Sequence, residues 1–565
     1  MTKTTLKLFN TLSRTKEEIQ PLDGNTIRMY TCGPTVYDFP HVGNMRAFVL
    51  EDLLKRTLLY FGYSVQHLMN ITDVGHLVSD EDDGEDKMEK GARREHKSVW
   101  EVARMYTNAF YDDLKTLNIK LPDALDPLPQ TLEVTREEDQ HFARATDHIA
   151  EQIALVNALT EKGYTYAADD GIYFDTSKLS DYGKLAKLDI EGLEAGKRVE
   201  VVSGKKNPTD FALWKFSPVD EERQMEWVFD GPRSGALIDN SSIINLQSSI
   251  PAAWKGNLAQ GESLTEEEKK TRGFPGWHIE CSAMAMKYLG ESFDIHCGGV
   301  DHIPVHHTNE IVQSEAATGK PFSKYWMHVD FLQIEGKKMS KSLGNFYTVP
   351  GLTQKGFSPR AIRFLYLSSH YRQQQNFTLQ ALEQSQNTLS SIDQFVKSLG
   401  EVAGSRLQVA GGVETTPFEK GSTDRTVGGF ERNDNGQTSP LIANRLSLTA
   451  SQFDSGLSDD LNIPQAITSV FDLMREVNPA LQNGTLSSSD AEAVLQWLRK
   501  INEVLGVFTF EFNDEIPSEV QALVDQRKLA RENKDFAGSD TLRDRIEALG
   551  YMVKDTKDGQ KVEKK

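Results

Sequence analysis

The feature that most constrains the fold is a strand, a turn, a helix and a second strand that follow one another near the start of the chain. Residues 26–31 are predicted to form a strand that stops at the Cys-Gly-Pro turn of residues 32–34. An amphipathic helix is predicted from about 41 to 61, and the second strand over 63–70. This order forms a βαβ unit, which requires a parallel sheet. Because ligands of such sheets bind at the carboxyl ends of the strands, the turn over 32–44 is a candidate site.

Length and cysteine content set the broad class of protein. A chain of 565 residues is too long for one hydrophobic core and suggests roughly three or four domains. No apolar run reaches the roughly 20 residues of a membrane span, and residues 1–20 lack a targeting signal. Three scattered cysteines cannot form a disulfide framework and fit a reducing compartment. We therefore expect a cytoplasmic protein with no membrane association.

The net charge of −20 on its own argues against a nucleic-acid partner, because phosphate contacts need lysine and arginine. The negative charge lies outside the tail, however, since acidic and basic residues balance over 515–565. A polyanion can therefore still bind a local basic face there. Arg527 and Arg531, spaced i,i+4 on a predicted helix, are the best candidates for such a contact, although charged residues more often form a solvated face.

A phosphate-binding turn is predicted where the first strand is joined to its helix. Gly43 lets a ligand approach the backbone, and the helix N-terminus offers free N–H groups and the positive end of its dipole. His41 is placed to donate a hydrogen bond to a phosphate oxygen. The alternative is a helix cap beside a turn, which the sequence H-V-G-N over 41–44 leaves open.

A second anion-binding element is the sequence K-M-S-K-S over 338–342. Lys338 and Lys341 stand three residues apart in a loop of small residues, so both can face one anion and stabilise charge on a leaving pyrophosphate. The alternative is a solvated basic loop. Together the two elements resemble the H-I-G-H and K-M-S-K-S signatures of class I aminoacyl-tRNA synthetases. The resemblance implies an α/β fold with a Rossmann-like parallel-sheet catalytic core.

Four residues far apart in the sequence have the chemistry of zinc ligands. His306 and Glu310, spaced i,i+4, share one face of a predicted helix. Cys281 lies on the preceding helix, and Cys32 follows the first strand. Thiolate, imidazole and carboxylate groups all bind zinc, which prefers four ligands. The spacing alone does not establish that the four meet, and the alternative for the cysteines is burial as small apolar residues.

Three sequence blocks resemble those of the cysteinyl-tRNA synthetase family: T-C-G-P-T-V-Y-D over 31–38, G-W-H-I-E-C-S-A-M over 276–284 and V-H-H-T-N-E over 305–310. The resemblance implies that one Zn²⁺ is held by four residues, namely Cys32, Cys281, His306 and Glu310.

Two neighbours of this set are not expected to bind zinc. His307 is the rival of His306, but the residue four positions after it is Ile311, which cannot ligate a metal. Cys297 is expected to pack near the site.

Zinc has a physical reason in a site that selects cysteine. Cysteine and serine differ only in sulfur for oxygen, and steric or apolar discrimination of small differences yields about 1–3 kcal/mol. A soft thiolate binds zinc well and a neutral hydroxyl binds it poorly, and zinc lowers the pKa of the thiol so that it binds deprotonated. One metal contact can then replace an editing site, and no editing site is expected.

The resemblance also implies roles for the residues around the zinc ligands. Cysteine would contact Thr72, Trp277 and His278. ATP, with Mg²⁺ on its triphosphate, would contact His41, Gly43, Asn44, Asp301, Lys338, Ser340 and Lys341. The catalytic residues among these would be His41, Asn44, Lys338 and Lys341. For Thr72, His278 and Asp301 the alternative is a cap or a packed polar residue.

The sequence departs from the family pattern at two places. Asn44 stands where H-I-G-H has its last histidine, so an amide donor replaces one imidazole contact to ATP. The family's tail usually ends in an aromatic residue near 559–562, and none is present here. This puts one stacking contact with tRNA in doubt.

The resemblance implies a division of the chain into successive segments. These are the first half of the catalytic domain over 1–120, a connective insertion over 121–270, the second half with the metal helix and the K-M-S-K-S loop over 271–350, a helical bundle over 351–512 with a disordered insertion over 400–440, and a small anticodon-binding module over 513–565.

The activity that the resemblance implies is ligation of L-cysteine to tRNA(Cys) by a monomer. ATP would adenylate the amino acid with release of pyrophosphate, and cysteine would then pass to the 3′ end of the tRNA. One alternative is a ligase that couples cysteine to an amino sugar, which shares this core but lacks the C-terminal module. Another is a non-catalytic zinc protein that binds nucleic acid, which would have no use for His41 or the K-M-S-K-S loop.

Overall fold

The structure of the chain is a computed structural model. It describes residues 5–75, 86–187, 205–218, 223–229, 268–337, 339, 344–404, 438–510, 518–556 and 559–564. Residues 230–267, at the end of the predicted connective insertion, and most of the predicted disordered insertion over 400–440 lie outside the described residues, as do Lys338, Ser340 and Lys341.

The core of the molecule is a five-stranded sheet in the order β12-β11-β3-β4-β5, in which every neighbouring pair is parallel. Its strands are β3 (Thr26–Thr31), β4 (Ser64–Ile71), β5 (Phe142–Arg144), β11 (Phe293–Gly299) and β12 (Ser323–Val329). Helix α1 (Val42–Tyr60) connects β3 to β4, so the predicted βαβ unit and parallel sheet are confirmed. The central strand β3 pairs on one side with β4 and on the other with β11, which comes more than 260 residues later in the sequence.

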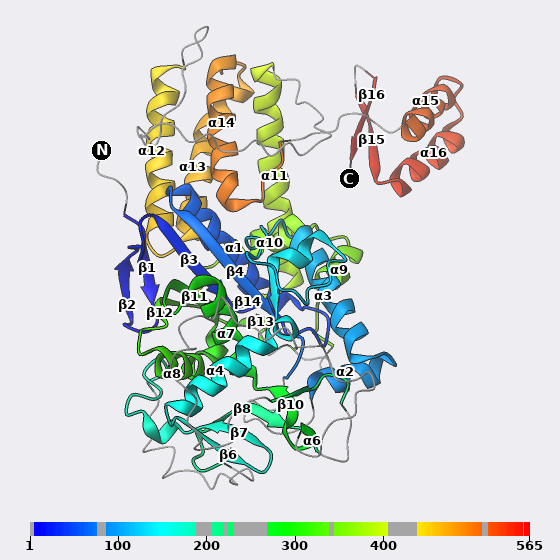
Figure 1. Ribbon diagram of the computed structural model, residues 1–565. Coiled ribbons are helices and arrows are strands. Elements are labelled where there is room, and N and C mark those ends of the chain that lie inside the picture. Colours follow the sequence, from blue (N-terminus) through cyan, green and yellow to red (C-terminus); the bar gives the residue numbers. More distant parts are fainter. Residues whose placement is uncertain are drawn as a thin grey trace.

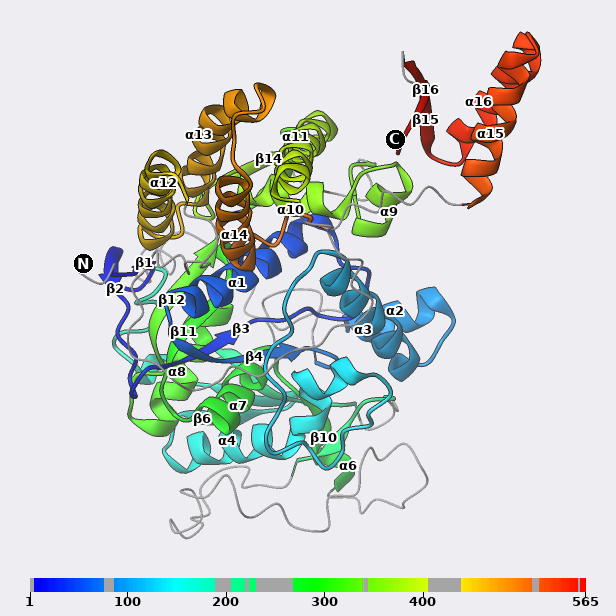
Figure 2. The ribbon, with the colours of Figure 1, turned by 90° about the horizontal axis from the view of Figure 1, so that it is seen from above.

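Helices cover both faces of this sheet. Figure 2 shows α1 on one side, and α4 (Ile149–Glu161), α7 (Trp277–Leu289) and α8 (His306–Thr318) on the other. Most of α1 is buried, because its other side is covered by helices from the carboxyl-terminal half of the chain. The arrangement places the start of α1 and the starts of α7 and α8 near the same edge of the sheet.

A second sheet and two helices lie between the halves of the parallel sheet in the sequence. The helices are α2 (Lys87–Glu95) and α3 (Val99–Thr116). The antiparallel sheet has the order β6-β7-β8-β10-β9, with strands β6 (Thr165–Ala168), β7 (Gly171–Phe174), β8 (Phe211–Phe216), β9 (Trp227–Val228) and β10 (Arg272–Pro275). Strand β10 leads directly into α7, which ties this sheet to the parallel one.

Two short elements frame the sequence K-M-S-K-S. Strand β13 (Leu332–Ile334) precedes it and pairs in parallel with β14 (Gln375–Phe377). Helix α9 (Val349–Gln354) follows it. At the amino terminus, β1 (Lys7–Asn10) and β2 (Thr15–Glu18) form an antiparallel hairpin.

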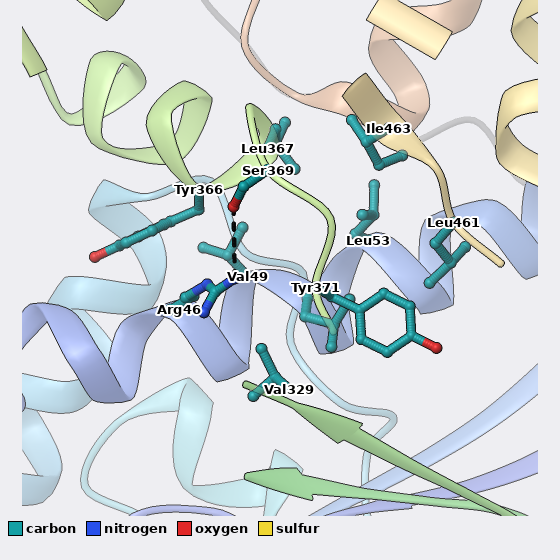
Figure 3. Close-up of a pocket in the computed structure, with 11 residues that line it drawn as sticks. Arg46, Val49, Leu53, Val329, Tyr366, Leu367, Ser369, Tyr371, Leu461 and Ile463 are labelled. Carbon is teal, nitrogen blue, oxygen red and sulfur yellow. Dashed lines mark hydrogen bonds between the residues drawn. The ribbon is translucent and has the colours of Figure 1, made fainter. Parts of the chain in front are cut away.

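The region after the parallel sheet is mostly helical, as predicted for 351–512. Figure 1 shows a bundle whose helices run side by side, made of α11 (Leu379–Ala403), α12 (Pro440–Ser458), α13 (Ile463–Gln482) and α14 (Ser488–Leu505). Helix α10 (Pro359–Leu367) lies where the bundle meets α1. A cavity of about 20 Å³ at this junction is lined by α1, α10 and the end of β12 (Figure 3). It holds about one water molecule at most.

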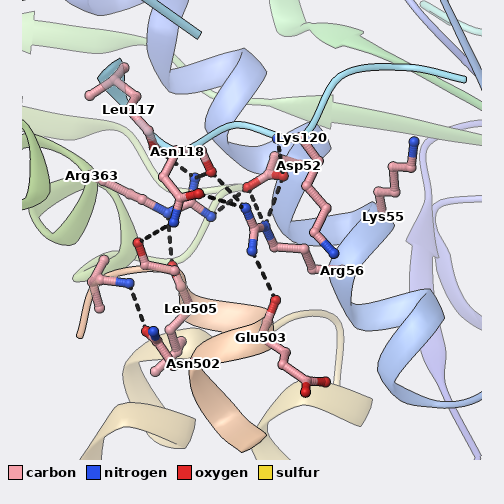
Figure 4. A network of polar contacts seen from close by, with 12 residues as sticks. Asp52, Lys55, Arg56, Leu117, Asn118, Lys120, Arg363, Asn502, Glu503 and Leu505 are labelled. Atoms are coloured by element: carbon pink, nitrogen blue, oxygen red, sulfur yellow. Dashed lines mark hydrogen bonds and ion pairs between the residues drawn. The ribbon is translucent and has the colours of Figure 1, made fainter. Parts of the chain in front are cut away.

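A buried polar network joins the second half of α1 to the bundle (Figure 4). The guanidinium of Arg363 lies 2.5 Å from the carboxylate of Asp52, which also pairs with Arg56 at 2.8 Å. Arg363 donates further to the carbonyl oxygens of Leu505 (2.8 Å) and Leu117 (3.1 Å). Because Arg363 is fully buried, this network connects the bundle to the parallel-sheet core in the interior of the molecule.

The last described segment has a small core of its own. Helices α15 (Ser518–Glu532) and α16 (Phe536–Ala548) pack with the hairpin of β15 (Tyr551–Thr556) and β16 (Gly559–Lys564). Val520, Leu523, Val524, Ile546 and Val553 form its buried cluster. Among the described residues, no helix combines the length and apolar character needed to cross a bilayer.

Candidate active site and metal centre

A pocket of about 630 Å³ opens at the carboxyl ends of β3 and β11. Its lining includes the turn and helix start that contain His41, Gly43 and Asn44, and also residues 329–332. Its floor reaches Cys32 and His306. The pocket therefore brings the predicted phosphate-binding turn and the predicted metal ligands into one space.

The helix start is capped by the residues predicted to bind phosphate. The Nδ1 atom of His41 accepts a hydrogen bond from the backbone N–H of Asn44 (3.1 Å), and the Asn44 amide oxygen accepts one from the backbone N–H of His41 (3.2 Å). This reciprocal pair satisfies the cap and places the proton of a neutral His41 ring on Nε2. The cap therefore coexists with a donor to a ligand, and it explains why asparagine serves at position 44.

Two glycines allow close approaches around the pocket. A Cβ on Gly43 would lie 3.0 Å from the His41 ring and 3.1 Å from the Met339 side chain. A Cβ on Gly299 would lie 2.1 Å from a carboxylate oxygen of Asp301. Asp301 itself stands on the 3₁₀ turn Val300–His302 after β11 and lines the pocket.

The four residues predicted to bind zinc meet in the interior. The ligand atoms of Cys32, Cys281, His306 and Glu310 all lie within 4.8 Å of one another, and all four residues are buried. The Nε2 atom of His306 lies 2.9 Å from a Glu310 oxygen and 3.4 Å from the sulfur of Cys281. The end of β3 contributes Cys32, while the facing sides of α7 and α8 contribute the others.

The protonation of this cluster suits a cation. Burial raises the pKa of the Cys281 thiol, but its contacts with Cys32 and His306 lower it overall to about 6. Burial lowers the pKa of His306, yet the charges of Glu310 and Cys281 raise it overall to about 10. Burial also raises the pKa of Cys32, which keeps its proton. A bound metal ion would displace the protons of Cys32 and His306, and two sulfurs, one nitrogen and one oxygen fit zinc.

A second group of possible ligands overlaps the first. It consists of Cys32, His296, His307 and Glu310, again all buried and within 4.8 Å. The Nε2 atom of His307 lies 3.3 Å from the sulfur of Cys32. The sequence argument against His307 considered only partners on its own helix. In the structure His307 reaches Cys32 at the end of β3, so it needs no ligand at Ile311.

Histidines outside the predicted set hold this cluster in place. His296 on β11 lies 2.7 Å from the second oxygen of Glu310, and His307 lies 2.7 Å from His328 on β12. Side chains alternate along β11, so His296 and Cys297 lie on opposite faces of the sheet. This alternation is the only pattern in the sequence that could have indicated a position for His296 near the cluster. Nothing in the spacing signals His328, since its place depends on the pairing of β11 with β12.

The residues predicted to contact cysteine occupy different positions. Trp277 lines the pocket and stacks on His306, with ring centroids 4.2 Å apart. The Thr72 hydroxyl donates to the carboxylate of Glu280 at 3.0 Å, and Thr72 is buried behind the pocket lining. His278 is also behind the lining, with its Nδ1 atom 3.0 Å from Nδ1 of His306. The packed alternative thus fits Thr72 and His278 in this structure.

The two arginines predicted to contact tRNA differ in exposure. Arg531 is exposed on α15, whereas Arg527 is only 1% exposed. The prediction for Arg527 as a surface contact is therefore wrong, because residues four positions apart share a helix face but neighbouring elements can cover that face at one turn and leave it open at the next.

Family models match most of the chain. The model described as tRNA synthetases class I (C) catalytic domain matches residues 18–249 and 251–387. The DALR domain matches residues 452–509, and the Cysteinyl-tRNA ligase anticodon binding domain matches residues 513–562.

Full-length relatives and solved structures agree with these matches. The chain is 41% identical to Cysteine--tRNA ligase 1 of Burkholderia lata, covering 99% of the chain and 96% of the relative. It is 37% identical to Cysteine--tRNA ligase of Chlamydia felis, covering 99% and 98%. A crystal structure of Mycobacterium tuberculosis methionyl-tRNA synthetase bound by methionyl-adenylate shares the fold, with a TM-score of 0.53, 14% identity and coverage of 91% and 96%. The chain therefore belongs to the cysteine–tRNA ligase family of class I tRNA synthetases.

Proposed function

We propose that the chain ligates L-cysteine to tRNA(Cys) in two steps at this pocket. First, a carboxylate oxygen of cysteine attacks the α-phosphorus of ATP, and pyrophosphate leaves. Then a hydroxyl of the terminal ribose of tRNA attacks the carbonyl carbon of the adenylate, and AMP leaves. The observation that carries the proposal is the buried Cys/His/Glu cluster beside a helix start suited to phosphate.

Residues at the pocket wall would stabilise the charge that builds up on the phosphates. The capped His41 ring donates from Nε2 to a phosphate oxygen, and the positive end of the α1 dipole lies beside the same charge. The carboxylate of Asp301 accepts hydrogen bonds from the ribose hydroxyls. Lys338 and Lys341, together with Mg²⁺, balance the charge of the leaving pyrophosphate.

Recognition of the amino acid would fall to the metal cluster. Cys32, Cys281, His306 and Glu310 would hold Zn²⁺, which when bound supplies a Lewis acid that takes a thiolate well and a hydroxyl poorly. Trp277 covers the His306 ring and closes one side of the pocket. His278 and His296 orient the ring of His306 and the carboxylate of Glu310 through their contacts.

The match of residues 513–562 to an anticodon-binding domain supports tRNA rather than an amino sugar as the acceptor. Arg531, which is exposed on α15, would contact the tRNA backbone. The division into domains, the cytoplasmic location and the monomeric state stay predictions from the sequence.

Exchange of labelled pyrophosphate into ATP tests the first step. We expect exchange with cysteine and none with serine, in a sample that contains about one zinc per chain. No exchange in a folded, zinc-loaded sample would contradict the proposal.

A lysine variant separates catalysis from mere binding of nucleic acid. Lys341→Ala should abolish most of the exchange while zinc content and tRNA binding stay near those of the unaltered chain, because Lys341 acts on the leaving pyrophosphate. Unchanged exchange in this variant would contradict the role proposed for Lys341, whereas no exchange in either protein would favour a non-catalytic protein.

A further inference from the structure

Arg46 lies in the second turn of α1 and is only 3% exposed. Its guanidinium donates to five oxygens, four of them backbone carbonyls: those of Asp330 (2.5 Å), Phe331 (2.9 Å), His370 (3.4 Å) and Gln373 (2.7 Å), with the hydroxyl of Ser369 (3.5 Å) as the fifth. A single side chain thus satisfies the main chain of two separate segments.

Those two segments lead into the paired strands β13 and β14. Asp330 and Phe331 directly precede β13, and residues 369–373 precede β14. Because Leu332 is paired with Gln375, Arg46 holds the entrance of both strands at once. Residues 330–332 also line the pocket, together with His41, Gly43 and Asn44 at the start of α1.

The first turn of α1 is attached to the same region by two more hydrogen bonds. The N–H of Val42 donates to the carbonyl of Tyr347 (3.0 Å), and the hydroxyl of Tyr366 donates to the carbonyl of Val42 (2.7 Å). Figure 3 shows Arg46, Ser369 and Tyr366 around the small cavity at this junction. Since the cavity has room for about one water molecule, the contacts serve to join elements and not to bind a ligand there.

Arg46 and Arg363 are both buried on carbonyl oxygens, yet their environments differ. Arg363 is paired with the carboxylate of Asp52, whereas none of the five acceptors of Arg46 is a carboxylate. Burial lowers the pKa of Arg46 to about 10, so it remains charged at neutral pH. Apolar side chains could join these elements at a smaller desolvation cost. The use of a buried arginine therefore indicates that Arg46 sets the geometry of the junction rather than its stability.

We propose that Arg46 is a positioning residue for adenylation. It fixes the distance between the wall at 330–332 and the wall that carries His41 and Asn44, so that ATP is held between them in the reactive geometry. The inference rests on the proposed function, and a displacement of about 1 Å at such a site costs roughly 100-fold in rate.

The test compares Arg46→Met and Arg46→Lys with Val49→Ala in cysteine-dependent pyrophosphate exchange, normalised to zinc per chain. Val49 lines the same small cavity on the same helix, so its truncation loosens packing without touching the carbonyls. For Arg46→Met we expect kcat/KM for ATP to fall about 100-fold while the KM for cysteine stays unchanged. Arg46→Lys should recover part of the loss, because an ammonium reaches fewer carbonyls than a planar guanidinium.

Several outcomes would overturn the inference. One is an unchanged kcat/KM for ATP in Arg46→Met, and another is a decline that affects ATP and cysteine equally, as loosened packing would. If Arg46→Met does not fold, unchanged ATP saturation in Arg46→Lys overturns it. If the unaltered chain lacks exchange, the proposed function fails, and equilibrium binding of ATP to Arg46→Lys decides the role of Arg46 by itself.

Discussion

The two ends of the pocket are built by different means. At the metal end, buried side chains from the end of β3 and from α7, α8 and β11 contact one another. Their sulfur, imidazole and carboxylate groups lie within a few ångströms, so that opposite charges are paired. At the nucleotide end, His41, Gly43 and Asn44 are close in sequence and only partly buried, and Arg46 on the same helix binds the main-chain carbonyls of Asp330 and Phe331. The nucleotide end therefore tolerates exchanges such as asparagine at position 44, whereas the metal end depends on the identity of each group.

Two buried carboxyl groups express the same contrast. Burial raises the pKa of Glu310, but His296 and His306 hold it well below its usual range. Among the described residues, no charged partner lowers the pKa of Glu51 on α1, and burial raises that pKa well above the usual range, opposed only by the Thr31 hydroxyl. Partners, and not burial alone, decide which carboxyl group is ionised.

The largest effect is expected at the metal end. Cys281→Ser should remove zinc and lower cysteine-dependent exchange by more than the roughly 100-fold that follows loss of a group outside the ligand sphere. Equilibrium binding of ATP should persist, because the nucleotide wall is separate. Cys297→Ser is the matched control, since Cys297 is a buried thiol outside both candidate ligand groups. Full zinc and an unchanged KM for cysteine in Cys281→Ser would remove the distinction between the two ends.

The next effect concerns a region that belongs to neither end. Arg363→Met leaves Asp52 and three carbonyls with fewer partners, and should lower the free energy of unfolding by about 3–5 kcal/mol. Urea unfolding measures the loss, and zinc content and both KM values should remain unchanged in the folded protein. A selective rise in the KM for ATP would mean that the far half of α1 also sets the nucleotide geometry.

A smaller effect is expected from the group behind Glu310. His296→Phe keeps the stacking on Trp326, whose ring centroid lies 4.5 Å away, but removes the hydrogen bond to the carboxylate. Zinc affinity should fall about 10- to 100-fold, as judged by competition with a chelator. His67→Phe on β4 changes a buried histidine of the same sheet that is bonded to Thr31, and it should keep the affinity. Equal losses in the two variants would show that sheet packing is responsible.

The last effect is a pH dependence of stability. Because the pKa of Glu51 is raised in the folded protein, the folded state binds more protons than the unfolded state above the ordinary glutamate pKa of about 4.3. Its contribution to the free energy of unfolding therefore falls as pH rises, by up to about 1.4 kcal/mol per unit until the folded pKa is reached. The free energy of unfolding of Glu51→Gln, relative to that of the unaltered chain, should therefore be higher at pH 8 than at pH 5. A difference that is independent of pH would mean that the carboxyl group has an ionised partner after all.

Local pattern was enough to predict the βαβ unit, the helix start at His41 and the shared face of His306 and Glu310. The complete ligand set came from resemblance, because no spacing brings Cys32 to Cys281. The histidines at 296, 307 and 328 were not predicted, since they meet only when β11 pairs with β3 on one side and β12 on the other. The error at Arg527 has a similar origin, because the outward face of α15 depends on which elements pack against it.

The placement of β11 beside β3 has a consequence for the order of events during synthesis. When the first strands leave the ribosome, β3 can pair with β4, but its other edge has no neighbour until Phe293–Gly299 has been made. An unpaired inner strand is a site for association with other chains. The quartet around Cys32 is also incomplete until Glu310 has emerged. The proposed metal could therefore bind all four residues only after more than half of the chain has been translated, when β11 is already available to pair with β3.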